Sequence, residues 1–366
     1  MIVKGEYDKK FSSVINLFEN QVSGNKSGAA FAVYKNGEAI IDVFGGFQNF
    51  STKTLWSKDT VVNVHSTGKG IAIFCLAILI ENKQLNLNAY ISEYWPEFKH
   101  NIKVKTLLSH QAGLYGWRKK MKAEDLLDSD LCSNLIAKQK PFNKPNDETC
   151  YHAMTIGYAI NKIFKNINGC TIGEFINQFF YEQRNINCFI GVPDKILKKI
   201  SRTSSIRSKG LPIAKDIYTS RAFLNPKINI KTTNTNSWAQ AEIPALNCHS
   251  NASSLARIYD MFINGDYTKK IISKNTLKKI LNVESKKMDF VLRVPIKWSS
   301  AGFILDGGKL FGKSKNAFGH TGSGGSVAFA DPDANLSFSY TPSLLSENLM
   351  FDNRAMELIE KTYNLI

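Results

Sequence analysis

The sequence has no apolar run long enough to cross a lipid bilayer. Its longest such run, residues 71–80, has ten residues, whereas a spanning helix needs roughly 20. We therefore interpret this run as a buried core helix. The N-terminal stretch has no apolar signal-peptide segment, and Glu6, Asp8 and Glu19 argue against a transit peptide. We expect a cytoplasmic protein without a membrane span.

Cysteine is scarce and widely spaced. The six cysteines form no C-x-x-C pair, and the histidines show no metal-ligand spacing. In a chain without a secretion signal this pattern predicts free, buried thiols. We expect no metal site, and no residue pattern calls for a cofactor.

Acidic residues are too few to balance the basic ones. Asp and Glu total 31 against 47 Lys and Arg, which gives a net charge of +16. The densest basic clusters are Lys119, Lys120 and Lys122 and then residues 198–209, where no aromatic residue is interleaved. Because charge runs are usually solvated surface, we expect no specific nucleic-acid partner.

What is present is an ordinary globular composition. Of the 366 residues 43% are hydrophobic and 11% are aromatic, and these residues run throughout the chain. This composition excludes intrinsic disorder, and the absence of a heptad or triplet period excludes a coiled coil or a collagen-like rod.

The order of the elements predicts a sheet made from both chain ends. Apolar residues recur at helical spacing over 7–21, and two alternating runs then flank Asn36-Gly37, a strong hairpin signal. Residues 70–281 are helical and loop-rich, 326–341 form a second strand–turn–strand pattern, and 352–363 form a final helix. We therefore predict an α/β (α+β) fold whose antiparallel sheet has flanking helices and is interrupted by a mostly helical insertion. The expected division is residues 1–69 with 285–366 for the sheet domain and 70–284 for the inserted domain.

Ser66 and Lys69 form an S-x-x-K pattern at the start of the apolar helix. Residues three apart on a helix share one face, and a Lys amine whose pKa is lowered can accept the proton of a neighbouring Ser hydroxyl. The alternative is that Ser66 is a simple helix N-cap. A second S-x-x-K, Ser23 to Lys26, lies in a Gly/Asn turn with no buried helix after it.

Two further segments could complete such a site. Tyr151 lies at a loop-to-helix junction, and a nearby ammonium would favour its phenolate; the alternative is a core-lining tyrosine. The segment His320 to Ser326 is rich in glycine and precedes an apolar strand. Its backbone N–H groups could stabilise an oxyanion, although it could also be a plain hairpin loop.

In this order and separation, the three elements resemble the serine β-lactamase and penicillin-binding-protein superfamily. The likeness is to its class C-related branch, with the family VIII carboxylesterases and the β-lactamase domain-containing proteins of animals. It extends over roughly residues 25–345, through the blocks VVNVHSTGKGIAIFCLAILIENKQLNLNAYISEYWPEF, VKTLLSHQAGL, YHAMTIGYAI, IPALNCHSNASSLARIY and FGHTGSGGSVAFADPDANLSFSY.

The resemblance implies a β-lactamase/transpeptidase-like fold with the active site between the sheet and the inserted domain. By this resemblance Ser66 is the acylated nucleophile, Lys69 its proton-shuttling neighbour and Tyr151 the partner base. The oxyanion hole would use the N–H groups of Ser66 and Ser323, and the family's Lys-Thr-Gly is here His320, Thr321 and Gly322.

Two departures from the family pattern affect the expected substrate. Ala153 replaces the Asn of Y-x-N, and His320 replaces the Lys of Lys-Thr-Gly. A neutral imidazole is a poor partner for a substrate carboxylate. We therefore predict a carboxylesterase-type serine hydrolase acting on a small ester or amide. A β-lactamase or D,D-peptidase activity and a non-catalytic scaffold are the alternatives, and the oligomeric state stays open.

Overall fold

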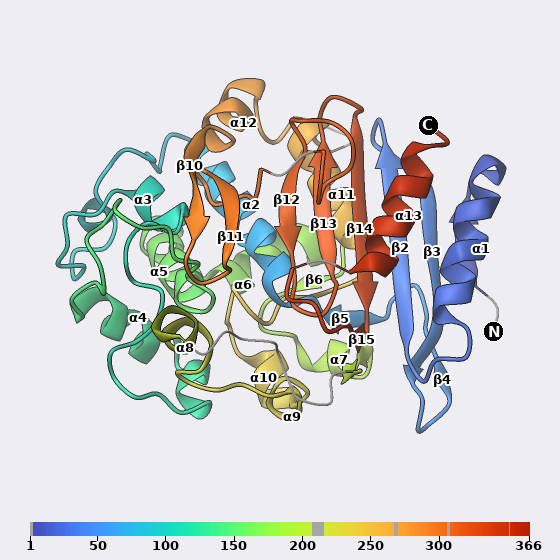
Figure 1. Cartoon of the computed structure of the whole chain (residues 1–366), viewed down its shortest axis with the longest axis horizontal. Coiled ribbons are helices and arrows are strands. Elements are labelled where there is room, and N and C mark those ends of the chain that lie inside the picture. The colour runs from blue at the N-terminus through green and yellow to red at the C-terminus, as the bar shows by residue number, and fades with distance from the viewer. Residues whose placement is uncertain (1–2, 207–215, 267–269, 306–307, 351) are drawn as a thin grey trace.

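A seven-stranded antiparallel sheet joins the two ends of the chain (Figure 1). The computed structural model describes residues 3–206, 216–266, 270–305, 308–350 and 352–366, so part of the basic stretch 198–209 lies outside the described residues. The strands, in spatial order, are β1 (Lys4–Tyr7), β3 (Glu38–Asn49), β2 (Gly28–Lys35), β14 (Leu336–Pro342), β13 (Val327–Asp331) and β12 (Phe318–Thr321), and β4 (Thr54–Leu55) pairs with β3. The predicted sheet from both termini is confirmed.

The hairpin between β2 and β3 follows from its two turn residues. Asn36 and Gly37 both have positive φ, 53° and 88°, which is the conformation of the two-residue turns that match strand twist. Lys35 then faces Glu38, and the pairing continues to Gly28 opposite Gly46. The turn predicted from Asn36-Gly37 is therefore confirmed.

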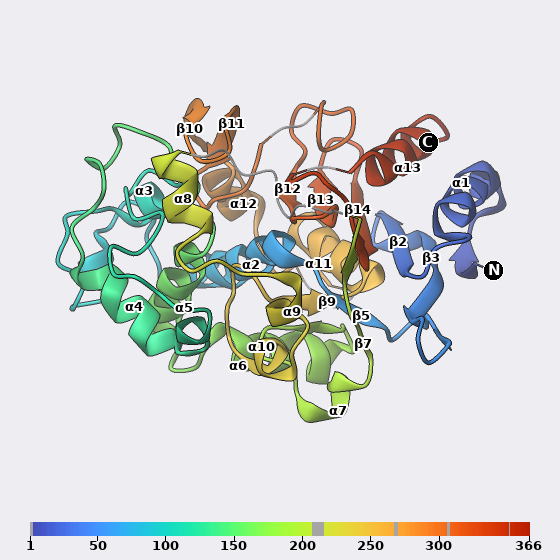
Figure 2. The same ribbon diagram turned by 60° about the horizontal axis from the view of Figure 1, so that its bottom comes forward.

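Helices cover both faces of this sheet. Helices α1 (Ser12–Val22) and α13 (Asn353–Tyr363) lie side by side over one face, and α11 (Ala252–Ile263) packs on the other (Figures 1 and 2). The helix predicted from residue 7 starts later. Residues up to Tyr7 pair with β3 as an edge strand, and Asp8 then caps a short 3-10 turn.

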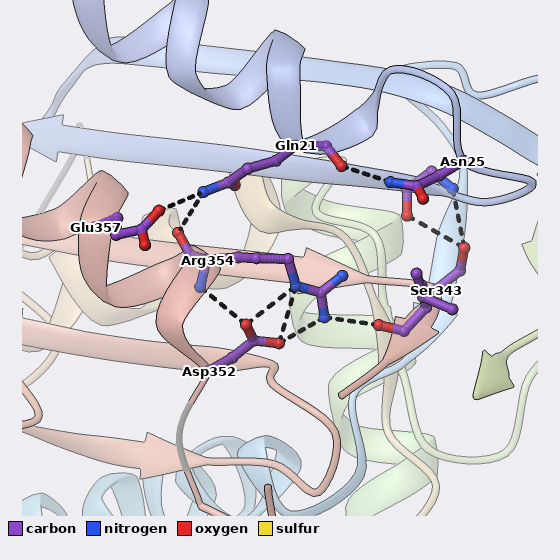
Figure 3. Close-up of polar contacts among 8 residues, drawn as sticks. Gln21, Asn25, Ser343, Asp352, Arg354 and Glu357 are labelled. Carbon is purple, nitrogen blue, oxygen red and sulfur yellow. Dashed lines mark hydrogen bonds and ion pairs between the residues drawn. The ribbon is translucent and has the colours of Figure 1, made fainter. Parts of the chain in front are cut away.

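An ion pair between the buried Asp352 and the partly exposed Arg354 lies at the start of the C-terminal helix, beside the segment that follows β14 (Figure 3). Arg354 Nη2 lies 2.5 Å from Asp352 Oδ2 and donates to the Leu344 carbonyl at 2.8 Å. Gln21 on α1 donates to the Arg354 carbonyl at 3.1 Å. The two terminal helices are thus fixed to each other and, through Leu344, to the segment that follows β14.

The central part of the chain is mainly helical, and the described residues form three small sheets besides the large one. Its helices are α2 (Gly68–Glu81), α3 (Val104–Leu108), α4 (Ser129–Lys138), α5 (Thr155–Asn168), α6 (Ile172–Ile176), α7 (Asp194–Leu197), α8 (Ile217–Phe223), α9 (Ile230–Thr233), α10 (Asn236–Gln240) and α12 (Lys274–Ile280). One small sheet has the order β6 (Cys188–Phe189), β9 (His249–Ser250), β5 (Val61–Asn63) and β7 (Ile200–Ser201). The others pair β10 (Val283–Asp289) with β11 (Val294–Ser299), and β15 (Leu344–Leu345) with β8 (Ser204–Ser205).

The division into a sheet domain and an inserted domain stays a prediction. Helix α11 lies within residues 70–284 and packs against β2, β13 and β14. Helix α2 has 14 residues and is almost entirely buried. Across the described part of the chain, no helix combines the length and the apolar character that a bilayer crossing requires.

Candidate active site

Ser66 lies in a tight turn between a strand and the most buried helix. Strand β5 ends at Asn63, and a 3-10 turn over His65–Thr67 leads directly into α2. His65 has a positive φ of 49°, and the Val64 N–H donates to the Cys248 carbonyl at 2.8 Å. The apolar sequence of α2 buries the helix and so fixes the position of Ser66 at its start.

Lys69 is the second residue of α2 and faces Ser66. Its Nζ is 3.0 Å from Ser66 Oγ, 2.9 Å from the Ala153 carbonyl and 3.0 Å from the Ala245 carbonyl. The residue is 3% exposed. Burial therefore lowers the pKa of the Lys69 ammonium well below its ordinary value.

Tyr151 contacts both Ser66 and Lys69. Its hydroxyl is hydrogen-bonded to the Ser66 side chain, and burial raises the pKa of Tyr151 in spite of that bond. The Lys69 Nζ lies 4.9 Å from the centre of the Tyr151 ring. The pKa shifts of the two groups thus favour a neutral amine beside a neutral phenol.

The Tyr151 ring and backbone are held by the β10–β11 hairpin. Asp289 Oδ1 accepts hydrogen bonds from the N–H groups of Tyr151, Val291 and Leu292 at 3.1, 2.9 and 3.0 Å. The Trp298 ring stacks on the Tyr151 ring, with centres 5.7 Å apart and planes within 7°. This hairpin therefore sets where the phenol points.

His320 reaches the site from the edge strand β12. It is 2% exposed, and its Nδ1 lies 2.7 Å from the Thr321 carbonyl. Burial, and then the neighbouring Lys69, lower the pKa of His320 to about 3. At neutral pH the imidazole is uncharged.

The glycine-rich loop after β12 is tied to the turn that carries Ser66. Ser326 Oγ donates to the Val64 carbonyl at 2.7 Å. A Cβ on Gly322 would come within 2.2 Å of Ser326 Oγ and 2.3 Å of the Val64 carbonyl oxygen, so a larger residue does not fit there. Gly322 N–H donates to the Ser326 carbonyl and Gly324 N–H to the Asn348 carbonyl. Among the described residues, the intervening Ser323 N–H has no acceptor.

A cavity of about 660 Å³ opens beside Ser66. Ser66, Tyr151, His320 and Ser323 all line it. Most of its other lining residues are aliphatic or aromatic. The predicted nucleophile thus faces a space large enough for a small-molecule ligand.

The structure brings the six residues predicted for the site into one place. Gly322 packs between the loop and the turn, and the other five lie on or next to the cavity: Ser66, Lys69, Tyr151, His320 and Ser323. The sequence reasoning missed the Ala245 carbonyl, Asp289 and Trp298. The region of Ala245 was part of a resembling block, whereas nothing in the sequence signalled Asp289 or Trp298.

Comparisons with known proteins agree with this arrangement. A family model described as Beta-lactamase matches residues 14–361. The esterase/beta-lactamase LipL of Mycobacterium tuberculosis is 26% identical over 375 residues, which cover 96% of this chain and 85% of LipL.

Two solved structures share the whole fold. A penicillin-binding protein homolog from Caulobacter crescentus has a TM-score of 0.93 and 28% identity, with 100% of both chains covered. A family VIII carboxylesterase has a TM-score of 0.93 and 29% identity, also with 100% of both chains covered.

Proposed function

The chain belongs to the β-lactamase family and is a serine hydrolase, and from this premise we propose that it is a carboxylesterase that works through an acyl-enzyme on Ser66. The observation that carries the proposal is the position of the Lys69 amine. It lies between Ser66 Oγ and two backbone carbonyls, with burial favouring its neutral form.

The three hydrogen-bonding neighbours of the Lys69 amine suit a role as a general base. A neutral amine has two N–H bonds and one lone pair. The carbonyls of Ala153 and Ala245 take the two N–H bonds, so the lone pair is directed at Ser66 Oγ, 3.0 Å away. Ser66 then donates its proton to Lys69 as its oxygen attacks the ester carbonyl.

Tyr151 acts in this proposal as a neutral phenol. Its raised pKa disfavours the phenolate, so it is an acid that protonates the departing alkoxide and recovers a proton from Lys69. This assignment makes Lys69 the base of the Lys69–Tyr151 pair. Water then attacks the acyl carbonyl and gives a proton to Tyr151 as Tyr151 passes its own to Lys69, and Lys69 returns this proton to Ser66 Oγ as the acyl bond breaks and the acid leaves.

The oxyanion of the tetrahedral intermediate lies between two backbone donors, the N–H groups of Ser66 and Ser323. The Ser326 bond to the Val64 carbonyl holds the two donor segments together. Such preorganised donors are worth about 10² to 10³ in rate each.

An ester is favoured over a β-lactam for two reasons. Ala153 has no carboxamide to hold a substrate amide, and His320, with its pKa lowered to about 3, offers no charge to a substrate carboxylate. The similarity to a family VIII carboxylesterase and to LipL, whose name includes esterase, supports the same choice.

The test is labelling with a fluorophosphonate probe together with hydrolysis of p-nitrophenyl esters. We expect the wild-type chain to be labelled and active, and Ser66→Ala to lose both. Ser23→Ala is the matched control, because Ser23 belongs to the other S-x-x-K pattern, and it should behave as wild type. Full labelling of Ser66→Ala would refute the assignment.

A β-lactamase activity is the second candidate, because the name of LipL includes both activities. Nitrocefin turnover above that of Ser66→Ala would support it. We expect little turnover, because Ala153 lacks a carboxamide for the substrate amide and His320 offers no charge to the substrate carboxylate.

We also propose that the protein works in the cytosol. Its six cysteines are free, and Cys188 Sγ and Cys248 Sγ share a hydrogen bond at 3.7 Å and form no disulfide. A reducing compartment keeps such thiols apart. Fractionation of the source cells, with recovery of the esterase activity in the cytosolic fraction, is the measurement; recovery outside the cell would contradict the proposal.

A further inference from the structure

We propose that the substrate of Ser66 is an uncharged ester with a flexible aliphatic chain, and that this chain lies in the cavity beside Ser66. The inference rests on the proposed esterase function and adds the chemical class of the substrate. It is carried by the size, the walls and the charge of the cavity.

The size of the cavity exceeds what a small ester needs. At about 660 Å³ it falls within the range of roughly 300–1,000 Å³ that accommodates drug-sized ligands. An acetyl group attached to Ser66 would leave most of this space to water. The cavity is therefore built for a larger part of the substrate than the reacting carboxyl group.

Two walls of the cavity carry mainly aliphatic side chains and come from distant parts of the chain, and the rings of Tyr151, Phe223, Trp238 and Trp298 also line it. One wall is the segment from the end of α8 to the first residue of α9, and the other is the segment that follows β14. Together they contribute six long, flexible or branched side chains, namely Leu224, Ile228, Ile230, Leu345, Leu349 and Met350. Such a surface binds methylene groups and offers an aliphatic chain few polar competitors.

The charge of the cavity excludes a second charged group on the substrate. No carboxylate lines it, and the one formally charged lining residue among those the structure describes is Lys227, which is exposed to solvent. His320 is neutral. A substrate carboxylate that entered would lose its hydration without gaining a buried cation, which is costly.

The chain-length dependence of hydrolysis tests the inference. Burial of one methylene corresponds to about a fourfold gain in kcat/KM. We expect kcat/KM to rise by about this factor per methylene along p-nitrophenyl esters from acetate towards octanoate, or along alkyl acetates if the chain belongs to the alcohol. A flat or falling profile in both series would overturn the inference.

A charged analogue tests the second half of the proposal. The p-nitrophenyl monoester of adipic acid has the chain of the hexanoate with a carboxylate at its end. We expect it to react more than about tenfold more slowly than the hexanoate. Equal rates would show that the cavity accepts charge and would overturn the claim of an uncharged substrate.

A substitution in the cavity wall tests whether the chain-length dependence of kcat/KM comes from the cavity. Leu224 is 43% exposed, so Leu224→Asp can fold while placing a carboxylate on the wall. We expect it to lower the octanoate-to-acetate ratio of kcat/KM by about tenfold. Leu55→Asp is the control, because Leu55 is 51% exposed and lies outside the cavity lining, and it should keep the wild-type ratio. An unchanged ratio in Leu224→Asp would contradict the assignment of this wall.

Fluorophosphonate labelling separates the two proposals. If the chain is labelled at Ser66 and hydrolyses acetate but the profile is flat, the esterase function stands and the aliphatic substrate is wrong. If neither labelling nor hydrolysis of any ester occurs, the proposed function itself is wrong.

Discussion

Lys69 has three hydrogen-bonding neighbours: the Ser66 hydroxyl and the carbonyls of Ala153 and Ala245. Its pKa is lowered by burial, and among the described residues no carboxylate acts on it as a counter-ion. In its charged form it would be a buried ammonium held by neutral groups alone. In its neutral form the same contacts leave a lone pair for Ser66. The chemistry of this residue is therefore set by burial rather than by a partner charge.

Removal of the Lys69 amine tests this interpretation. Lys69→Ala should lower kcat/KM for a p-nitrophenyl ester by about 10²- to 10⁴-fold, the usual contribution of a general base. Because the unprotonated amine is the active form, wild-type activity should fall as pH drops through the lowered pKa of Lys69 and hold as pH rises. Lys26→Ala, in the other S-x-x-K, is the control. Retention of a tenth or more of the activity in Lys69→Ala would assign the base elsewhere.

Asp289 predicts a pH dependence of stability. Burial raises the pKa of Asp289 to about 6, above the value of about 3.9 of an unfolded chain. Its contribution to stability is thus present below about pH 4 and lost as pH rises through about 6. Asp289→Asn keeps an oxygen for the three N–H donors and removes the charge. From pH 4 to 7, its free energy of unfolding should gain about 2 to 3 kcal/mol relative to wild type.

Urea unfolding at the two pH values is the measurement, with the exposed Asp147→Asn as control. A difference between wild type and Asp289→Asn that does not change with pH would mean that the pKa of Asp289 is the same in the folded and the unfolded chain, and would contradict the prediction.

The residues proposed to react with the substrate could be predicted from the sequence, whereas most of the groups that hold them in position could not. Ser66 and Lys69 stand three apart on an apolar helix, which places them on one face whatever the rest of the fold does. The carbonyls of Ala153 and Ala245 carry no side-chain signature, and Asp289 reaches Tyr151 across 138 positions. Contacts of that kind depend on tertiary packing and leave no local pattern.

At the scale of elements, the ion pair of Asp352 and Arg354 lies where the start of α13 meets the segment after β14 (Figure 3). The Asp352 side chain is 3% exposed and that of Arg354 23%. A Cβ on Gly325 would come within 2.1 Å of Asp352 Oδ2, so the carboxylate also packs against the loop that carries Ser323. The pair thus connects the start of α13 with the proposed oxyanion loop.

Loss of Arg354 should be strongly destabilising. Arg354→Ala leaves Asp352 as a buried, unpaired charge, and we expect the free energy of unfolding to fall by about 3 kcal/mol or more. Glu357→Ala, on the exposed side of the same helix, should change it by less than about 0.5 kcal/mol. Urea unfolding measures both, and equal effects would show that the pair does not stabilise the fold beyond its helix.

The elements with strong local signals could be predicted, and the short ones could not. The Asn36-Gly37 hairpin and the final helix have turn and capping residues that act locally. The small sheet of β5, β6, β7 and β9 has strands of two or three residues, too short to show alternation. The helical spacing predicts a helix that starts at residue 7, but Tyr7 is the last residue of edge strand β1, because its pairing with β3 is decided by the sheet and not by its own residues.

At the scale of the whole molecule, the charge of +16 and the active site are separate features. Helix α12 and its surroundings carry many lysines, for example Lys274, Lys278 and Lys279, whereas the cavity has Lys227 as its one lysine or arginine among the described lining residues. Electrostatic steering acts on charged ligands, and an uncharged ester has no net charge for this surface to attract. The basic surface therefore should not assist capture of an uncharged ester.

Salt provides the test of this separation. Between about 0.02 and 0.5 M sodium chloride, we expect kcat/KM for p-nitrophenyl hexanoate to change by less than about twofold, while retention on heparin falls steeply as the basic surface is screened. Added heparin at low salt should leave the esterase rate unchanged for the same reason. A tenfold loss of kcat/KM with salt, or inhibition by heparin, would mean that the basic surface reaches the mouth of the cavity and takes part in substrate capture.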